Sequence, residues 1–419
     1  MEKTRQTAVV FIISVFIGLM ALLAVMLAEK GSYWEYFFWK DTADTGMDFY
    51  NSLAESAGGD PYGTYHTLYP PLGNAYFYGM HLMIPEEVRD SFPTDHDGIV
   101  AMRRTEQDLR TAQSAYMLYI AQLLTYTLGM MCVIAYKLRD RGFMSVLSGA
   151  AAVLTYGSLT AIERGNIISL AAMLTMVFLF GYDSRRRSVR ILSCIALSIA
   201  AALKLYPAIY GIFLLSDRRY KAAISTALTG ITLTIAPLYL FGGLRDLRIF
   251  LTELAGFNTD TGEAIYYRYG MRGIVEHISD HLYKRTGLTI PAQDRVSLIL
   301  LIIVSAVLTA AFFIHRDCCK KAFDITVILI LLQPKSTDYT LCFFIPVIIL
   351  MIYEAPVFRR EDLVYFIMLL ILTVPYPTGR INDRVSLILH HVDIVQSVLG
   401  IAVMYEFLVV CRHLLRKRG

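Results

Sequence analysis

The sequence predicts an all-α membrane protein with roughly twelve transmembrane helices. Of its 419 residues, 56% are hydrophobic and only 18% are charged, and the mean hydropathy is +0.50, which is too apolar for an ordinary soluble domain. The hydrophobic residues come in blocks of roughly 15 to 24, the length that a helix needs to cross the hydrocarbon core. These blocks must be helices, because lipid offers no hydrogen-bond partner to an open strand edge.

The net charge of +4 comes mostly from basic residues in short loops between the apolar blocks. Such loops indicate which side of the membrane they face, so the charge reports topology and not a nucleic-acid partner. The six cysteines show no paired spacing, and neither a disulfide framework nor a metal site follows from them. We expect a single transmembrane domain over residues 1–419 of a multi-pass cell-membrane protein, with both termini in the cytosol, no cofactor and no metal.

The first apolar run, Ala8 to Ala28, follows two basic residues and is too long for the apolar core of a signal peptide. We interpret it as a retained first span that enters from the cytosol, which makes residues 29–69 the first extracytoplasmic loop. Residues 48–57 of this loop are expected to form a short interfacial helix, preceded by an aromatic belt from Trp34 to Trp39.

A Tyr-Pro-Pro helix over residues 70–84 is predicted next, because proline is tolerated at a helix start. The segment is short for a span, and the clear span from about Thr111 to Tyr136 follows and ends in a basic cluster. If that cluster is cytosolic, the Tyr-Pro-Pro helix must enter and leave on the outer side, so we favour a re-entrant helix. The alternative is that it crosses the membrane and the charge rule fails downstream.

Two spans, near residues 143–162 and 167–182, flank the short outer turn Glu163 to Asn166. The next block, residues 191–215, is interrupted by a Lys-Leu-Tyr-Pro sequence and has basic residues at both ends. We predict a broken pair of helices whose tip reaches the outer half of the membrane. After one more span, residues 242–293 form a long outer segment that is rich in tyrosine, arginine and glycine.

The C-terminal third repeats the pattern of apolar blocks and short basic loops, with outer turns at residues 333–338 and 376–393. Its predicted spans are centred near Val304, Ile328, Val347, Leu369 and Val403.

Unusual polar residues gather on the predicted outer side, and ionisable groups at such depth are functional candidates by default. They are Asp48, Tyr69, Glu163, Arg164, Asn166, Lys204, Tyr206, Lys335 and Asp338. Asp48 has apolar and aromatic sequence neighbours, which strip water from a carboxylate and favour its protonated form, so it is the candidate catalytic base. One base, several cations and many aromatics suit an anionic lipid-linked donor and a sugar acceptor.

Simpler interpretations remain open for each of these residues. Asp48 could cap the interfacial helix, and Glu163 with Arg164 could merely end two helices at the interface. Lys204 could snorkel to the lipid headgroups, and Lys335 could be an ordinary solvated loop lysine.

Five short motifs occur in an order that resembles glycosyltransferase family 87, of the C-type superfamily of polytopic transferases that use polyprenyl-phosphate sugars. The family includes mannosyltransferases of phosphatidylinositol mannoside synthesis. The motifs are MDFY at residues 47–50, DPY at 60–62, YPPL at 69–72, RGN at 164–166 and KLYP at 204–207.

The resemblance implies a C-type architecture and an inverting transfer of a hexose, with mannose expected, from a polyprenyl-phosphate donor to a lipid-linked or glycan acceptor on the extracytoplasmic face. The family's base is the carboxylate of the first outer loop, a position that falls on Asp48. The expected donor-phosphate ligands are Arg164, Lys204 and Lys335, and the expected substrate-lining residues are Tyr50, Tyr69, Glu163, Asn166, Tyr206 and Tyr339. The sequence departs from the family at Tyr339, where a histidine is usual, and Lys335 is expected to take over that phosphate contact.

The rival interpretation is a secondary transporter or flippase for a lipid-linked or small anionic substrate, because many spans, a broken helix and buried charges fit that class as well. No two-fold repeat is visible in the sequence, and the polar residues gather at one face instead of the midplane. An assembly or scaffold protein would explain none of the polar motifs.

Overall fold

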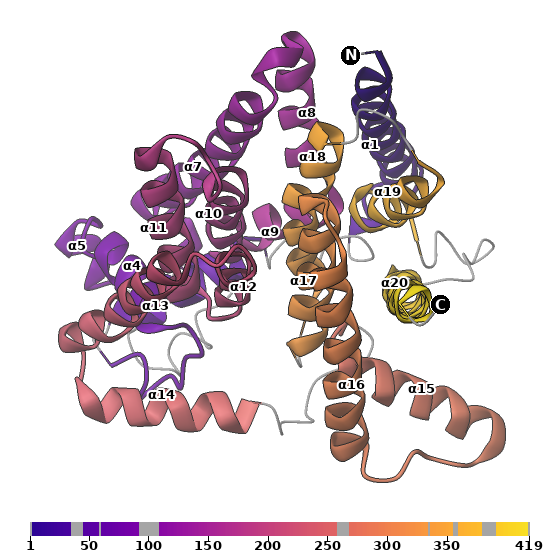
Figure 1. Ribbon diagram of the computed structural model, residues 1–419. Coiled ribbons are helices and arrows are strands. Elements are labelled where there is room, and N and C mark those ends of the chain that lie inside the picture. The colour runs from indigo at the N-terminus through magenta and orange to yellow at the C-terminus, as the bar shows by residue number, and fades with distance from the viewer. Residues whose placement is uncertain are drawn as a thin grey trace. The chain divides into compact units, whose positions relative to one another are not determined.

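The computed structural model describes residues 2–34, 45–57, 60–91, 109–257, 268–333, 336–354, 359–378 and 391–417. Every regular element in these ranges is a helix, as Figure 1 shows, which confirms the all-α prediction. Contacts divide the chain into two compact units, which are described one at a time below. The first comprises Met1–Phe37, Met131–Leu159 and Thr261–Gly419, and the second comprises Phe38–Met130 and Thr160–Asp260.

Among the described residues, five helices are long and apolar enough to cross a membrane, or six if a bent pair of helices counts as one span. The five are Gln6–Ala28, Gln113–Lys137, Tyr220–Leu240, Gln293–Ile314 and His391–Arg416, and the bent pair is Phe143–Val153 with Tyr156–Arg164. The prediction of roughly twelve spans is therefore not confirmed. Several apolar blocks form helices of 11 to 17 residues, which rise about 16 to 26 Å and fall short of the ~30 Å hydrocarbon core.

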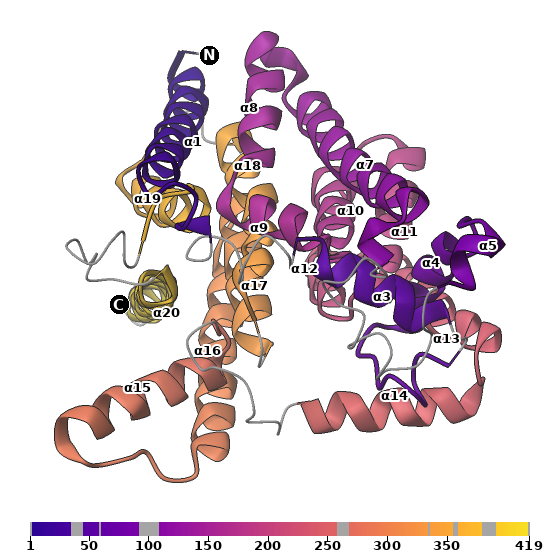
Figure 2. The same cartoon turned by 180° about the vertical axis from the view of Figure 1, so that it is seen from behind.

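The second unit holds the MDFY, YPPL, RGN and KLYP motifs. Its core is α10 (Ile168–Gly181), which is apolar all round and packs against α11 (Arg187–Leu203). In Figure 2, α3 (Met47–Ala57) lies beside α4 (Pro71–His81), and the two helices are in contact. The unit also contains α5 (Glu86–Arg89), α7 (Gln113–Lys137), α9 (Tyr156–Arg164), α12 (Ile212–Ser216), α13 (Tyr220–Ile235) and α14 (Leu244–Phe257), with α7 and α9 belonging to it in part.

The KLYP motif lies where α11 ends. Lys204 follows the last residue of α11 in an extended conformation, with φ −146° and ψ 125°. A 3₁₀ helix, η4 (Tyr206–Gly211), then leads into the short α12. Pro207 has no backbone N–H to continue an α-helical ladder, which accounts for the change of helix type at this point.

The first unit is organised around α17 (Cys318–Leu332) and α18 (Phe344–Glu354), whose residues are almost all buried. The helix α16 (Gln293–Ile314) packs against α17, α15 and α20. The unit also contains α1 (Glu2–Ala28), α8 (Phe143–Val153), α15 (Met271–Thr286), η7 (Asp338–Phe343), α19 (Arg360–Thr373) and α20 (His391–Arg416). Of the predicted aromatic belt before α3, residues 35–39 lie outside the described residues.

Candidate active site

Asp48 is the second residue of α3, so it lies inside the first helical turn and not at the cap position in front of it. Gly46 precedes the helix with φ +70°, a left-handed conformation that glycine adopts without strain. The N–H of Gly46 donates to the backbone oxygen of Glu163 at 2.6 Å, which ties the start of α3 to the end of α9. The same tie brings the RGN motif next to Asp48.

Two side chains of the RGN motif hold the Asp48 carboxylate. The Arg164 guanidinium donates to Oδ1 at 2.5 Å, and the Asn166 amide donates to Oδ2 at 2.7 Å. The side chains of Arg164 and Asp48 are only 11% and 17% exposed, so the ion pair is largely shielded from water. The prediction that Asp48 lies in an apolar setting is therefore wrong. Its neighbours in the sequence are apolar, but its neighbours in space are a cation and an amide.

The orientation of the Asn166 side chain is fixed by its own second bond. Its Oδ1 accepts the backbone N–H of Ile168 at 2.9 Å, at the start of α10. A backbone N–H can only donate, so the amide nitrogen must face Asp48. Asn166 therefore joins the start of α10 to the carboxylate in one defined geometry.

The glycine of the RGN motif is required by the backbone. Gly165 has φ +64°, and a Cβ atom there would meet the Cβ of Phe49 at 2.7 Å and the ring of Tyr119 at 2.8 Å. Its carbonyl accepts a buried hydrogen bond from the Gln122 amide at 2.7 Å, and Gln122 is in turn bonded by the Tyr76 hydroxyl at 3.1 Å. A side chain at residue 165 would push α3 away from the turn that holds Asp48.

Lys204 and Tyr69 bring a second cation to the same unit. The Lys204 ammonium lies 3.9 Å from the centre of the Tyr69 ring, and it is close enough to Asp48 for the two charges to interact. Tyr69 packs edge-on against Phe77 of α4. Its carbonyl accepts the Tyr62 hydroxyl at 3.0 Å, so the DPY, YPPL and KLYP motifs meet at one place.

Three of the remaining predicted site residues lie in the second unit. Tyr50 is buried in a ring cluster with Phe49 and Tyr119, Glu163 is 5% exposed, and Tyr206 begins η4 two residues after Lys204. Tyr339 is half-buried in η7 of the other unit. Lys335 lies outside the described residues.

A family model for glycosyltransferase family 87 matches residues 109–334, which is more than half of the chain. The chain belongs to glycosyltransferase family 87. The comparisons with curated proteins and with solved structures found no match. Membership in the family indicates glycosyltransferase activity, with a sugar donor and an acceptor as substrates, and the apolar helices indicate a membrane protein.

The family 87 match begins after Asp48 itself. It covers Arg164 and Asn166, which contact Asp48, and it also covers Lys204. In a glycosyltransferase, a carboxylate can accept a proton, and cations near it can hold an anionic leaving group.

Sequence reasoning missed a second polar cluster, in the first unit of the chain. The Tyr269 hydroxyl donates to Asp338 Oδ1 and lies 2.9 Å from His391 Nδ1. The His391 ring stacks on Tyr156 with 3.8 Å between the ring centres. Only Asp338 was singled out from the sequence, because Tyr269 and His391 are distant from it along the chain and share no motif with it.

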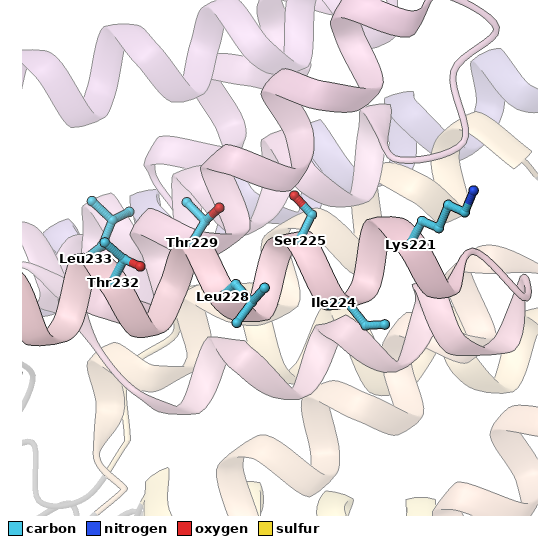
Figure 3. A pocket seen from close by; sticks show the side chains of 7 residues that line it. All are labelled: Lys221, Ile224, Ser225, Leu228, Thr229, Thr232 and Leu233. Atoms are coloured by element: carbon cyan, nitrogen blue, oxygen red, sulfur yellow. The ribbon is translucent and has the colours of Figure 1, made fainter.

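Three surface hollows among the described residues of the second unit involve α13. One is a groove of about 530 Å³ along the helix, lined by Lys221, Ile224, Ser225, Leu228, Thr229, Thr232 and Leu233. In Figure 3 the hydroxyls of Ser225 and Thr229 point away from Ile224 and Leu228. This groove contains none of the residues around Asp48, so we do not assign it the chemistry.

Another of these hollows is an apolar cavity of about 850 Å³ between α11, α12 and α13. Leu205, Ala208 and Ile212 line it beside the KLYP break, and α13 contributes Ile231 and Ile235. Its lining includes Ala201 and Leu205, which flank Lys204 along the chain.

Proposed function

We propose that this family 87 glycosyltransferase moves a hexose, mannose in the first instance, from a polyprenyl-phosphate donor to a lipid-linked or glycan acceptor on the extracytoplasmic face, with inversion. The observation that carries the proposal is the grouping of one carboxylate with two cations and an oriented amide. Asp48 supplies the carboxylate, Arg164 and Lys204 the cations, and Asn166 the amide.

The reaction is a single displacement. The acceptor hydroxyl gives its proton to Asp48 while its oxygen bonds to the anomeric carbon. The bond from that carbon to the phosphate oxygen breaks, and its electron pair leaves with the polyprenyl phosphate. An ionised carboxylate can accept about four hydrogen bonds, so an oxygen that already binds Arg164 or Asn166 keeps capacity for the acceptor.

Arg164 and Lys204 have different tasks in this proposal. Arg164 orients Asp48 through a short ion pair and adds positive charge beside the reacting hydroxyl. Lys204 stabilises the charge that develops on the leaving phosphate, and Tyr69 holds its ammonium by a cation–π contact, which contributes about 0.5 to 2 kcal/mol. Because Arg164 and Lys204 supply positive charge, the proposed reaction needs neither a metal ion nor a cofactor. Lys335 remains proposed as a further phosphate ligand.

The polyprenyl chain would occupy the apolar cavity between α11, α12 and α13. The cavity lining includes Leu205, the residue after the proposed phosphate ligand Lys204. A lipid phosphate bound at Lys204 would therefore find apolar side chains for its first isoprene units. The cavity is open, so the rest of the polyprenyl chain would lie among the surrounding membrane lipids.

The finer topology is part of the same proposal: a C-type architecture with roughly twelve membrane crossings, some of them by short or bent helices, and both termini in the cytosol. Basic residues in short loops support this orientation. Asp48, Arg164 and Lys335 would then be extracytoplasmic, and Arg186, Lys320 and Arg416 cytosolic.

The test is a donor comparison with purified protein in lipid vesicles. We expect transfer of radiolabel to a lipid or glycan acceptor from a polyprenyl-phosphate hexose, fastest with mannose, and none from the corresponding nucleotide sugar. Transfer from the nucleotide sugar alone would refute the donor assignment. Transport of the intact labelled lipid between leaflets, with no new glycosidic product, would favour the flippase interpretation.

A further inference from the structure

A separate cluster of polar side chains joins α15 to the first turn of α20, and none of its members has a role in the proposed transfer. His277 and His281 are four residues apart on α15, a spacing that puts both rings on one face of the helix. Asp393 is the third residue of α20. Both helices belong to the first unit of the chain.

The three side chains aim single atoms at one point. His277 Nε2 lies 2.9 Å from Asp393 Oδ1 and 3.0 Å from His281 Nε2. All three atoms lie within 4.8 Å of one another. The two imidazole rings meet nearly edge to face, at 79°.

Protons satisfy both contacts only if the single N–H of His277 is shared between two acceptors. A neutral imidazole carries one N–H, and the contacts on both sides of His277 use the same nitrogen, Nε2. If His277 Nε2 donates to Asp393, it has no lone pair to accept from His281. If His281 donates to His277, no proton lies between His277 and Asp393. A cation at the centre of the three atoms satisfies all of them at once.

The geometry and the ligand types fit a divalent transition-metal ion. Zinc binds histidine nitrogen and carboxylate oxygen at about 2.0 to 2.2 Å, which sets neighbouring ligand atoms about 3 to 3.5 Å apart. We propose that His277, His281 and Asp393 bind one such ion, of the Zn²⁺ type, and that the ion links α15 to the start of α20. His281 is exposed, so the ion can enter from water and keep a water ligand.

The ion would reinforce an existing junction. The Gln396 amide of α20 donates to the backbone oxygen of Arg268, just before α15, at 2.8 Å. Arg272 and Glu276 form an ion pair at 2.8 Å within α15. The Gln396 bond and the packing of α15 against α16 hold α15 in place without the ion. Removal of one metal ligand should therefore abolish metal binding and leave the fold intact.

Metal content is the decisive measurement. Full-length protein, purified through a tag without histidine and stripped with EDTA, is dialysed against Zn²⁺ and analysed by mass spectrometry of the metal. We expect about one ion per chain in the wild type and nearly none in His277→Ala or His281→Ala. His66→Ala is the matched control, because His66 pairs with Glu253 at 3.0 Å but has no second histidine, and it should keep the ion.

Thermal unfolding supplies the second readout. Zn²⁺ should raise the midpoint of the stripped wild type and of His66→Ala, and leave His281→Ala unchanged, because only a bound ion stabilises the folded state. Without metal, His281→Ala should unfold at the midpoint of the stripped wild type. The proposal is overturned if the wild type binds no ion, or if both α15 variants retain it. It is also overturned if the ion is lost only in His315→Gln, which would assign it to the buried group of His315, Asp324 and Glu406.

Discussion

Replacing Asp48 by asparagine separates the proton-accepting role of the carboxylate from its structural role. The asparagine oxygen can still accept from Arg164, as Asp48 Oδ1 does at 2.5 Å. Its amide nitrogen then faces the Asn166 nitrogen, which now lies 2.7 Å from Asp48 Oδ2. Asn166 cannot turn over, because Ile168 N–H already occupies its oxygen. Two donors would therefore meet, and one buried donor loses its acceptor.

The structure sets the size of both effects. One buried donor without an acceptor costs about 1 to 3 kcal/mol of folding free energy, and the weaker bond of Arg164 to a neutral oxygen adds to that. The variant should fold with a lowered unfolding midpoint. Transfer should fall by about 10² to 10⁴-fold, the contribution of a positioned general base, because an amide cannot accept the proton.

Asn166→Ala is the matched control for this experiment. It removes the same hydrogen bond to Asp48 and the bond to Ile168 N–H, so its loss of stability should be similar. The carboxylate remains, and we expect transfer to fall by about tenfold or less. The assay is transfer of radiolabelled sugar from the polyprenyl-phosphate donor, with donor binding measured alongside. The reasoning fails if folded Asp48→Asn transfers as fast as Asn166→Ala.

Three further changes test the surroundings of the site. Gly165→Ala should lower the unfolding midpoint by the equivalent of about 1 to 3 kcal/mol, because alanine is strained at φ +64° and its Cβ meets Phe49; an unchanged midpoint would contradict that geometry. Lys204→Met should reduce kcat/KM about 10 to 10³-fold with Lys204→Arg less affected, and equal losses in both would indicate that charge is not what matters. In a background without the native cysteines, Ser32→Cys should react with a membrane-impermeant thiol reagent in intact cells and Ser188→Cys should not; the reverse pattern would invert the topology.

The sequence predicted the helical class, the family and the identity of several polar residues, but not how those residues contact one another. Asp48, Arg164 and Asn166 stand out because each is polar in an apolar context. The pairing of Arg164 with Asp48 joins residues 116 positions apart, and tertiary contacts such as the bond from Gly46 to Glu163 bring them together. Arg164 was therefore assigned to the donor phosphate from its charge alone.

Other features could not be predicted from the sequence either, because they depend on how distant parts of the chain come together. Hydropathy reports apolar blocks but not where a helix breaks, so residues 143–162 were expected to form one span, whereas α8 ends at Val153. The cluster of His277 and Asp393 was also missed, because its ligands come from helices that are distant along the chain. Its one sequence signal is the spacing of the two histidines on α15, which by itself is common in surface helices.

The stereochemistry of the product tests the central claim most directly. Purified protein is incubated with a polyprenyl-phosphate hexose labelled with ¹³C at the anomeric carbon, and the new glycosidic bond is analysed by NMR. A single displacement with Asp48 as the base predicts that the product carries the anomeric configuration opposite to that of the donor. A product that retains the donor configuration would require two displacements through a covalent intermediate and would contradict the account.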